Sequence, residues 1–201
     1  MNKDWNHIRR GDNQALKRVY ESHIQLLLAY GQKFSKDTNL VEDAIQEIFT
    51  SIWTNRENLS EVQSIKAYLM SSLKRKIIRK VNSSYHNRVD STDENYIFDA
   101  AIYIDDENVN DENQEKIAIL KSKIDQLSHR QKEIIYLKYF EGMDYEEIAQ
   151  IMNMQYQSVR NLYSRAISAL RTLISIILII LFSKMITYSQ LWSLLLVNIT
   201  L

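Results

Sequence analysis

Apolar side chains recur at helical spacing in three stretches of the first half of the chain. The stretch 12–35 follows Asp12, a typical helix N-cap, and the stretch 39–55 has the widest apolar face. A third stretch runs from 65 to 81, and the polar run 56–64 before it predicts a loop. Because apolar residues three and four apart share one face of an α-helix, these stretches are predicted to form a helical bundle.

The helical pattern resumes at 115–127 and again at 128–140. Ser128 and Gln131 open the second of these stretches with the spacing of a capping box. Residues 144–166 then hold two short apolar patterns joined by the sequence MNMQ. The second half of the chain is therefore also predicted to be helical.

Two residues indicate how the patterns in 144–166 are joined. Ala149 is small enough for two helices to cross closely, and Asn153 follows four residues later, where the chain must turn. Asn tolerates a left-handed backbone better than most residues. We therefore predict a helix-turn-helix, whose second helix would lie in a DNA major groove. A helical hairpin with a solvated polar face is the alternative. The polar residues predicted to face outward on the second helix are Arg160, Asn161, Ser164 and Arg165.

The segment between the two helical halves is strongly acidic. The net charge is +6 over residues 1–89, −10 over 90–115 and +4 over 116–201, although the whole chain sums to zero. Residues 82–114 show no sustained period, so we expect a flexible linker with a short apolar island at 96–104 that docks on a helical half. The charges suit two modules that bind a polyanion, or equally a solvated loop between two ordinary helical domains.

Composition narrows the class of protein. The chain has no Pro, three Gly and no hairpin signal, so we expect an all-α fold. It has no Cys, no Gly-rich phosphate loop and no nucleophile elbow, and its His residues do not have metal-ligand spacing. We therefore expect no enzyme, no cofactor and no metal site. No basic and apolar leader opens the chain, which favours a cytoplasmic protein. The scattered His residues are His7, His23, His86 and His129.

The end of the chain, 173–201, is predicted to form a hydrophobic C-terminal helix. Residues 173–182 are almost wholly apolar, and a span from 173 to 192 would be long enough to cross a bilayer. Such a span would bury Lys184 near mid-depth, at about 2.5–3.5 kcal/mol. Three interpretations stay open: an inner-membrane tether, a helix packed on this protein or a partner, and a poorly ordered extension.

Two parts of the sequence resemble a known family, the bacterial RNA polymerase sigma factors of the sigma-70 family, extracytoplasmic-function (ECF) group. IDQLSHRQKEIIYLKYFEGMDYEEIAQIMNMQYQSVRNLYSRAISALRTL (124–173) is similar to the family's domain 4 almost throughout. GDNQALKRVYESH (11–23), VEDAIQEIFTSIW (41–53) and SIKAYLMSSLKRKIIRKV (64–81) are similar to successive segments of domain 2. Two blocks in the family's order are far more specific than one helix-turn-helix.

The resemblance implies a domain organisation. It assigns sigma domain 2 to 1–81, the acidic linker to 82–114 and sigma domain 4 to 115–172, with its helix-turn-helix at about 144–166. The hydrophobic tail 173–201 extends beyond the family's usual end.

The resemblance also implies site residues. The family's core-polymerase-binding segment corresponds to the polar face of Asp43, Gln46 and Glu47. Its minus-ten recognition and melting segment corresponds to Lys66, Lys74, Arg75, Lys76, Arg79 and Lys80, with a base-capturing loop at 56–64. Its minus-thirty-five recognition helix corresponds to Gln157, Ser158, Arg160, Asn161, Ser164 and Arg165. Arg can pair with guanine, Asn with adenine, and a cationic helix can follow phosphates.

The function implied is promoter-specific transcription initiation, without covalent chemistry. The implied partners are core RNA polymerase, promoter DNA and an anti-sigma factor, with inner-membrane association through 173–201 if the tail is a tether. The alternative is a membrane-associated helix-turn-helix regulator that does not bind core polymerase. Such a regulator would not need the polar face of Asp43, Gln46 and Glu47.

Overall fold

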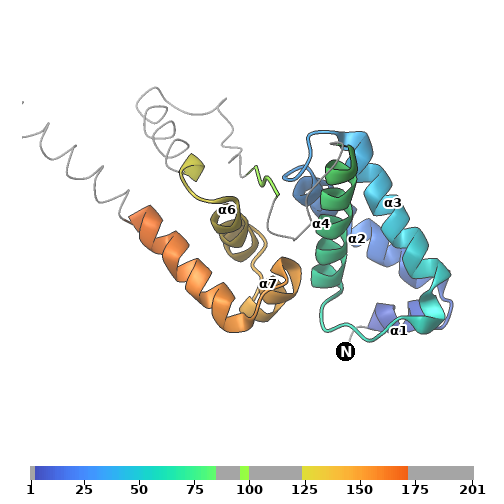
Figure 1. The fold of residues 1–201 in the computed structure, drawn as a ribbon. Coiled ribbons are helices and arrows are strands. Elements are labelled where there is room, and N and C mark those ends of the chain that lie inside the picture. The colour runs from blue at the N-terminus through green and yellow to red at the C-terminus, as the bar shows by residue number, and fades with distance from the viewer. Residues whose placement is uncertain (1–2, 85–95, 100–123, 172–201) are drawn as a thin grey trace, which may run out of the picture.

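The computed structural model describes residues 3–84, 96–99 and 124–171. Within these ranges every regular element is a helix, which confirms the all-α fold expected from the sequence. Residues 3–84 are called the N-terminal lobe below, and residues 124–171 the C-terminal lobe (Figure 1).

The N-terminal lobe contains α1 (Lys3–Arg9), α2 (Asn13–Gly31), α3 (Thr38–Thr54) and α4 (Ile65–Ser84), with the short 3-10 helix η1 (Arg56–Asn58) after α3. The three longer helices correspond to the three apolar stretches of the sequence. Asp12 caps α2 as predicted, since its side chain accepts from the backbone N–H groups of Gln14 and Ala15. Helix α1 was not expected, because only Trp5 and Ile8 mark its buried face.

Close packing of α2 against α3 and α4 depends on a glycine. A Cβ atom added to Gly31 would lie 2.5 Å from Cγ1 of Val41 on α3 and 3.2 Å from Cδ1 of Ile77 on α4. Real side chains do not approach so closely, so only glycine allows α2 to pack at this point. The lobe is thus a bundle whose three long helices meet around one apolar core.

The C-terminal lobe contains α6 (His129–Ile135), the π-helical turn η3 (Tyr136–Phe140), α7 (Tyr145–Met152) and a long final helix over 156–171. Helix α6 begins with the predicted capping box, in which the Ser128 side chain accepts from the Gln131 N–H and the Gln131 side chain accepts from the Ser128 N–H. The predicted helix over 128–140 is therefore confirmed, with a π-helical final turn.

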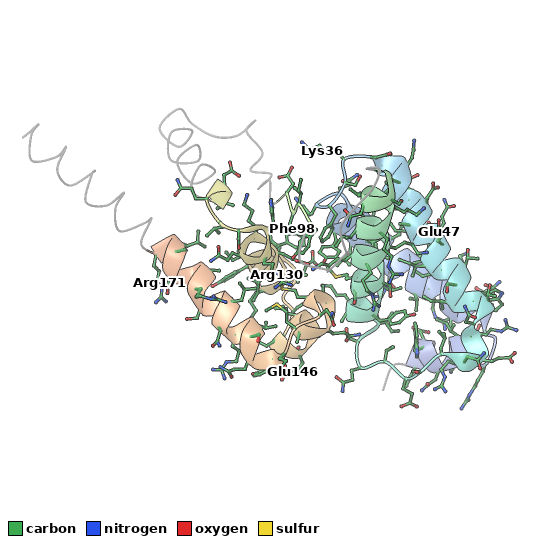
Figure 2. The ribbon with its side chains drawn as sticks, in the orientation of Figure 1. Lys36, Glu47, Phe98, Arg130, Glu146 and Arg171 are labelled. Atoms are coloured by element: carbon green, nitrogen blue, oxygen red, sulfur yellow. The ribbon has the colours of Figure 1, made fainter. Side chains whose placement is uncertain are left out.

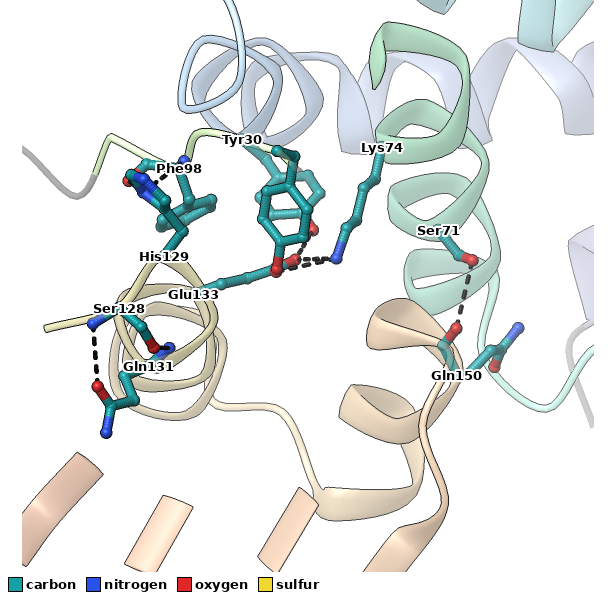
Figure 3. Close-up of polar contacts among 10 residues, drawn as sticks. Tyr30, Ser71, Lys74, Phe98, Ser128, His129, Gln131, Glu133 and Gln150 are labelled. Atoms are coloured by element: carbon teal, nitrogen blue, oxygen red, sulfur yellow. Dashed lines mark hydrogen bonds and ion pairs between the residues drawn. The ribbon is translucent and has the colours of Figure 1, made fainter. Parts of the chain in front are cut away.

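Helix α4 lies between the two lobes. It packs on α2 and α3 on one side and on α7 on the other (Figure 1). The described part of the predicted apolar island, residues 96–99, packs here: Phe98 is fully buried (Figure 2), and its backbone N–H donates to Nδ1 of His129 at 3.1 Å (Figure 3). Its ring contacts those of Tyr30, Phe34 and Tyr136.

Several sequence predictions fall outside the described residues. They concern most of the helix at 115–127, the linker apart from 96–99, and the hydrophobic tail 173–201. Within the described ranges, no helix is both long enough and apolar enough to cross a bilayer.

Candidate nucleic-acid interface

Residues 144–171 fold as two helices joined by a tight turn. A second capping box opens α7, with Asp144 and Glu147 exchanging side-chain and backbone hydrogen bonds. Asn153 ends α7 with φ 50° and ψ 51°, the left-handed conformation predicted for it. The Met154 N–H then donates to the carbonyl of Ala149 at 3.0 Å and closes the turn. The helix-turn-helix is thus fixed by local polar groups at its beginning and its turn.

The second helix, 156–171, presents a polar face to solvent. Val159, Leu162 and Ala166 are buried beneath it. The Gln157 side chain donates to Oδ1 of Asn161 at 3.2 Å. Ser158 is half-buried, and the remaining residues predicted to read the minus-thirty-five element are exposed, as contact with a DNA groove requires: Gln157, Arg160, Asn161, Ser164 and Arg165. Their DNA contacts stay a prediction.

An aromatic residue that the sequence reasoning missed stands at the start of this helix. Tyr156 is 42% exposed, and the guanidinium of Arg160 lies 5.9 Å from its ring centroid. The stacking restrains the side chain of Arg160 on the polar face. The spacing of four residues between an aromatic residue and an arginine on one helix was the signal available for it.

The predicted cationic face of α4 is divided by the fold. Arg75 and Arg79 are exposed. Lys76 and Lys80 lie beside them, and their ammonium groups contact the Glu47 carboxylate of α3 at 2.6 and 2.7 Å. These hydrogen bonds, that of Lys76 first, hold the pKa of Glu47 below its usual value. Two predicted DNA-binding lysines are thus paired with a predicted polymerase-binding carboxylate.

Lys74 does not lie on the exposed part of that face in the described arrangement, and its contact with DNA stays a prediction. Lys74 is 2% exposed, and its ammonium group contacts the two carboxylate oxygens of Glu133 on α6 at 2.9 and 3.0 Å (Figure 3). Lys66 is also turned toward the C-terminal lobe, since it pairs with the Glu141 carboxylate at 2.8 Å. In this arrangement neither lysine has an ammonium group free to contact DNA. The physical reason is that α7 and α6 cover this side of α4.

The junction between the lobes is a buried polar cluster. Glu133 is fully buried, and besides Lys74 it accepts a hydrogen bond from the Tyr30 hydroxyl at 2.8 Å and another from the Tyr96 hydroxyl. Ser71 adds a hydrogen bond to the Gln150 carbonyl at 3.3 Å (Figure 3). Among the described residues, no buried side-chain polar atom is without a partner. Burial and the charge of Glu133 raise the pKa of Tyr30 well above its ordinary value.

The cluster had a signal in the sequence. Lys74 stands four residues after Met70 and four before Ile78, on the buried stripe of α4. Glu133 likewise stands four residues before the buried Leu137. A charged residue in register with an apolar stripe indicates a buried, paired charge.

The predicted polymerase-binding face of α3 borders an open groove. The side chains of Asp43, Gln46 and Glu47 line one part of it, and Lys76 of α4 closes one side. Threonine and other polar residues continue the lining toward the end of α3. Figure 2 shows Glu47 on the side of α3 away from the C-terminal lobe. The fold therefore brings the three predicted residues together on a surface that the C-terminal lobe leaves uncovered.

A helical bundle with cations on one helix, followed by a helix-turn-helix, is an arrangement compatible with DNA binding. Comparison with family models makes the class of protein specific. Residues 19–85 match the model of sigma-70 region 2, and residues 117–170 match that of sigma-70 region 4. Together the two matches cover more than half of the chain, in the family's order. The chain belongs to the sigma-70 family of sigma factors.

Solved structures show the same fold. One is CnrH in complex with the cytosolic domain of CnrY, at 17% identity and a TM-score of 0.55, covering 86% of this chain and 95% of that one. Another is the sigma factor RpoE in complex with the anti-sigma factor NepR from Bartonella quintana, at 22% identity and a TM-score of 0.54, covering 79% and 96%. No curated protein matches this chain.

Proposed function

We propose that this chain is a sigma factor of the extracytoplasmic-function group, which binds core RNA polymerase and directs it to promoters with minus-thirty-five and minus-ten elements. The observation that carries the proposal is the match to region 2 and region 4, in that order, on one chain. The protein performs no covalent chemistry in this role. It acts by binding the open form of the promoter more tightly than the closed form.

Core polymerase binds the groove beside α3 in this proposal. Asp43, Gln46 and Glu47 supply acceptors and one donor group on an exposed helix face, next to polar groove walls. Such a face suits a basic helical surface on the enzyme. A polymerase cation that contacts Glu47 would compete with Lys76 and Lys80 for the same carboxylate. The two lysines would then become available to promoter phosphates.

Promoter DNA requires the lobes to separate. The two elements lie about 25 base pairs apart, which is roughly 85 Å along B-DNA at 3.4 Å per base pair. A compact body of the described size has a radius of gyration of roughly 14 Å. The packed lobes therefore do not reach both elements at once. Fully extended, residues 82–114 would span roughly 110 Å, so the linker is long enough for the open arrangement.

Separation also restores part of the predicted minus-ten surface. Lys66 and Lys74 are held by Glu141 and Glu133 only while the C-terminal lobe packs on α4. Once the lobes part, both ammonium groups join Arg75 and Arg79 on the surface of α4. The assignment of Lys74 to DNA therefore belongs to the open arrangement, and the structure describes a closed one.

An anti-sigma factor is the second partner that we propose. Both solved structures are complexes with a second chain: CnrH with the cytosolic domain of CnrY, and the sigma factor RpoE with the anti-sigma factor NepR from Bartonella quintana. A partner that binds the closed form would keep α4 covered.

Cell fractionation tests the tether interpretation of 173–201, since a tethered protein stays in the membrane pellet until detergent is added.

The proposal is tested by run-off transcription with sigma-free core polymerase on the promoter upstream of the chain's own gene. The protein should give a discrete transcript, and Asp43→Lys should abolish both the transcript and co-elution with core polymerase. Asp43 is preferred to Glu47 here, because reversing Glu47 would also repel Lys76 and Lys80. The matched control is Glu21→Lys, an equal charge reversal on α2, where, among the described residues, the carboxylate forms only an exposed pair with Lys17 of the same helix, at 3.7 Å. No transcript with the unaltered protein would refute the proposal.

The helix-turn-helix regulator is the weaker candidate. The region 2 match over 19–85 favours the sigma factor, because a regulator has no need of that lobe. If the unaltered protein binds the duplex promoter but does not co-elute with core polymerase, the regulator is the correct assignment.

A further inference from the structure

Helix α1 lies outside the residues that match region 2, yet it contacts η1 and, through Trp5, the loop that follows η1. That loop, residues 59–64, connects η1 to α4 and is the greater part of the segment to which the proposed function assigns base capture. An irregular loop has no helix or sheet hydrogen bonds of its own to hold its shape. The contacts from α1 therefore bear on the geometry of a proposed DNA-binding element.

Trp5 makes the central contact. Its indole N–H donates to the backbone carbonyl of Ser60 at 2.8 Å, across 55 residues of sequence. The indole is 1% exposed and packs edge-to-face on the ring of Tyr68, with 5.0 Å between centroids. A ring packed this closely has little freedom to rotate, so the Ser60 carbonyl that it binds is held in a fixed position relative to the bundle.

The two ends of the loop are fixed by local bonds. At the first end the Leu59 N–H donates to the Arg56 carbonyl, and the Arg56 guanidinium lies 4.9 Å from the centroid of the Trp53 ring. At the second end the Ser64 hydroxyl accepts from the Ala67 N–H and begins α4. Trp5 thus binds the loop at a point between two anchored ends.

Side chains in the middle of this loop face solvent. Ser60, Glu61 and Gln63 are exposed, whereas Leu59 and Val62 pack against the core. Polar side chains thus face solvent, while the two packed apolar side chains and the Trp5 hydrogen bond hold the backbone. Polar groups on a held backbone are what the recognition of an unpaired base requires.

Helix α1 is itself held firmly enough to act as a support. Ile8 is fully buried, and Asp4 accepts two hydrogen bonds from the Arg18 guanidinium of α2, at 2.7 and 3.1 Å. Gly11, with φ +88°, lets the chain reverse between α1 and α2. Trp5 is therefore connected to the bundle and not only to the loop.

We propose that Trp5 is a positioning residue for promoter melting: through its hydrogen bond to Ser60 it holds loop 59–64 in the shape that captures an unpaired minus-ten base. This role rests on the proposed function, because that function makes the loop a DNA-binding element. Trp5 itself touches no DNA. It lowers the conformational freedom that the loop would otherwise lose on binding a base.

The test compares two probes on holoenzyme reconstituted from core polymerase and the full chain. One probe is a fluorescent single strand carrying the minus-ten region of the chain's own promoter, on the non-template strand. The other is duplex DNA from the minus-thirty-five region. Trp5→Phe keeps an aromatic ring but removes the donor. It should weaken single-strand binding roughly 2- to 10-fold, the worth of one hydrogen bond, and leave duplex binding unchanged.

Ile8→Val is the matched control. It removes one buried methyl group from the same helix, so it reports whether loosening α1 alone weakens single-strand binding. Ile8→Val keeps the Trp5 hydrogen bond to Ser60, so its single-strand binding should equal that of the unaltered protein. If Trp5→Phe fails to fold, benzothienylalanine at position 5 keeps the shape of the ring and removes only the N–H.

The outcomes separate the two hypotheses. Equal single-strand binding by Trp5→Phe and the unaltered protein overturns the positioning role while the proposed function stands. If Trp5→Phe weakens the binding of both probes equally, or if Ile8→Val shows the same defect, the positioning role is overturned in favour of a general loss of stability. Holoenzyme that does not distinguish its own single strand from a scrambled one refutes the proposed function, and the positioning role with it.

Discussion

Replacing Glu133 with Gln should open or unfold the closed arrangement. Glu133 is 0% exposed and accepts from Lys74, Tyr30 and Tyr96. Glu133→Gln keeps the size of the side chain and one carbonyl acceptor, but it removes the charge that neutralises Lys74. The ammonium group is then buried without a counterion for as long as the lobes stay packed.

The magnitude follows from that burial. Breaking a buried ion pair by removing one partner costs about 3–5 kcal/mol, because the remaining charge has lost its water and its partner. Adding Lys74→Met removes the stranded charge, so that position 133 no longer needs a carboxylate to neutralise a neighbour. The double variant should therefore recover more than half of the loss, since one tyrosine hydroxyl can still donate to the amide oxygen and the other can accept from the amide N–H.

Two measurements follow the change. Urea unfolding gives the free energy of unfolding for each variant. The distance between spin labels at Glu42→Cys and Glu146→Cys, both exposed positions, reports whether the lobes stay packed. The chain has no Cys of its own, so these labels are specific. If the lobes separate without unfolding, the loss in the free energy of unfolding is limited to the free energy of the contact between the lobes. In that case the change appears as a broader distribution of distances between the two spin labels.

Two results would refute the role of the buried ion pair. If Glu133→Gln leaves both the free energy of unfolding and the distance distribution unchanged, the buried ion pair does not hold the lobes together. If the double variant loses as much as the single one, the stranded charge is not the cause.

Four further predictions follow from the structure. Gly31→Ala places a Cβ 2.5 Å from a side chain of α3 and should cost about 1–3 kcal/mol in urea unfolding. Asn153→Val, at φ 50°, should lower the melting temperature, whereas Asn153→Gly should not. The pKa of Tyr30 in the folded state lies well above its ordinary value, so the unfolded state loses the hydroxyl proton first as pH rises. The contribution of Tyr30 to the free energy of unfolding is therefore complete below about pH 10, and it should fall above that pH by about 1.4 kcal/mol per pH unit. Arg160→Ala should weaken binding to minus-thirty-five duplex by about 1–3 kcal/mol in fluorescence anisotropy, whereas Arg171→Ala, also exposed on that helix, should change the same binding much less.

The elements that the sequence predicted well are those whose signals are local. Helix α3 follows an unbroken apolar stripe, the capping box of Ser128 and Gln131 forms between residues three apart, and Asn153 adopts the left-handed turn expected of it. Each depends on interactions within one or two helical turns, which spacing along the chain reports directly. The exposure of the polar face at 156–171 follows from the same periodicity.

What the tertiary structure decided lies in contacts between distant residues. The environment of Lys74 depends on Glu133, 59 residues away, and that of Ser60 depends on Trp5, 55 residues away. Periodicity identifies which side of a helix is apolar, but it does not say which helix covers a neighbouring side or whether a charge there meets its counterion. The register of Lys74 with the apolar stripe of α4 indicates a buried charge, but it does not say which residue pairs with that charge. Only the packing of the second lobe on α4 decides that the partner is Glu133, because pairing between distant residues is a property of the assembled fold.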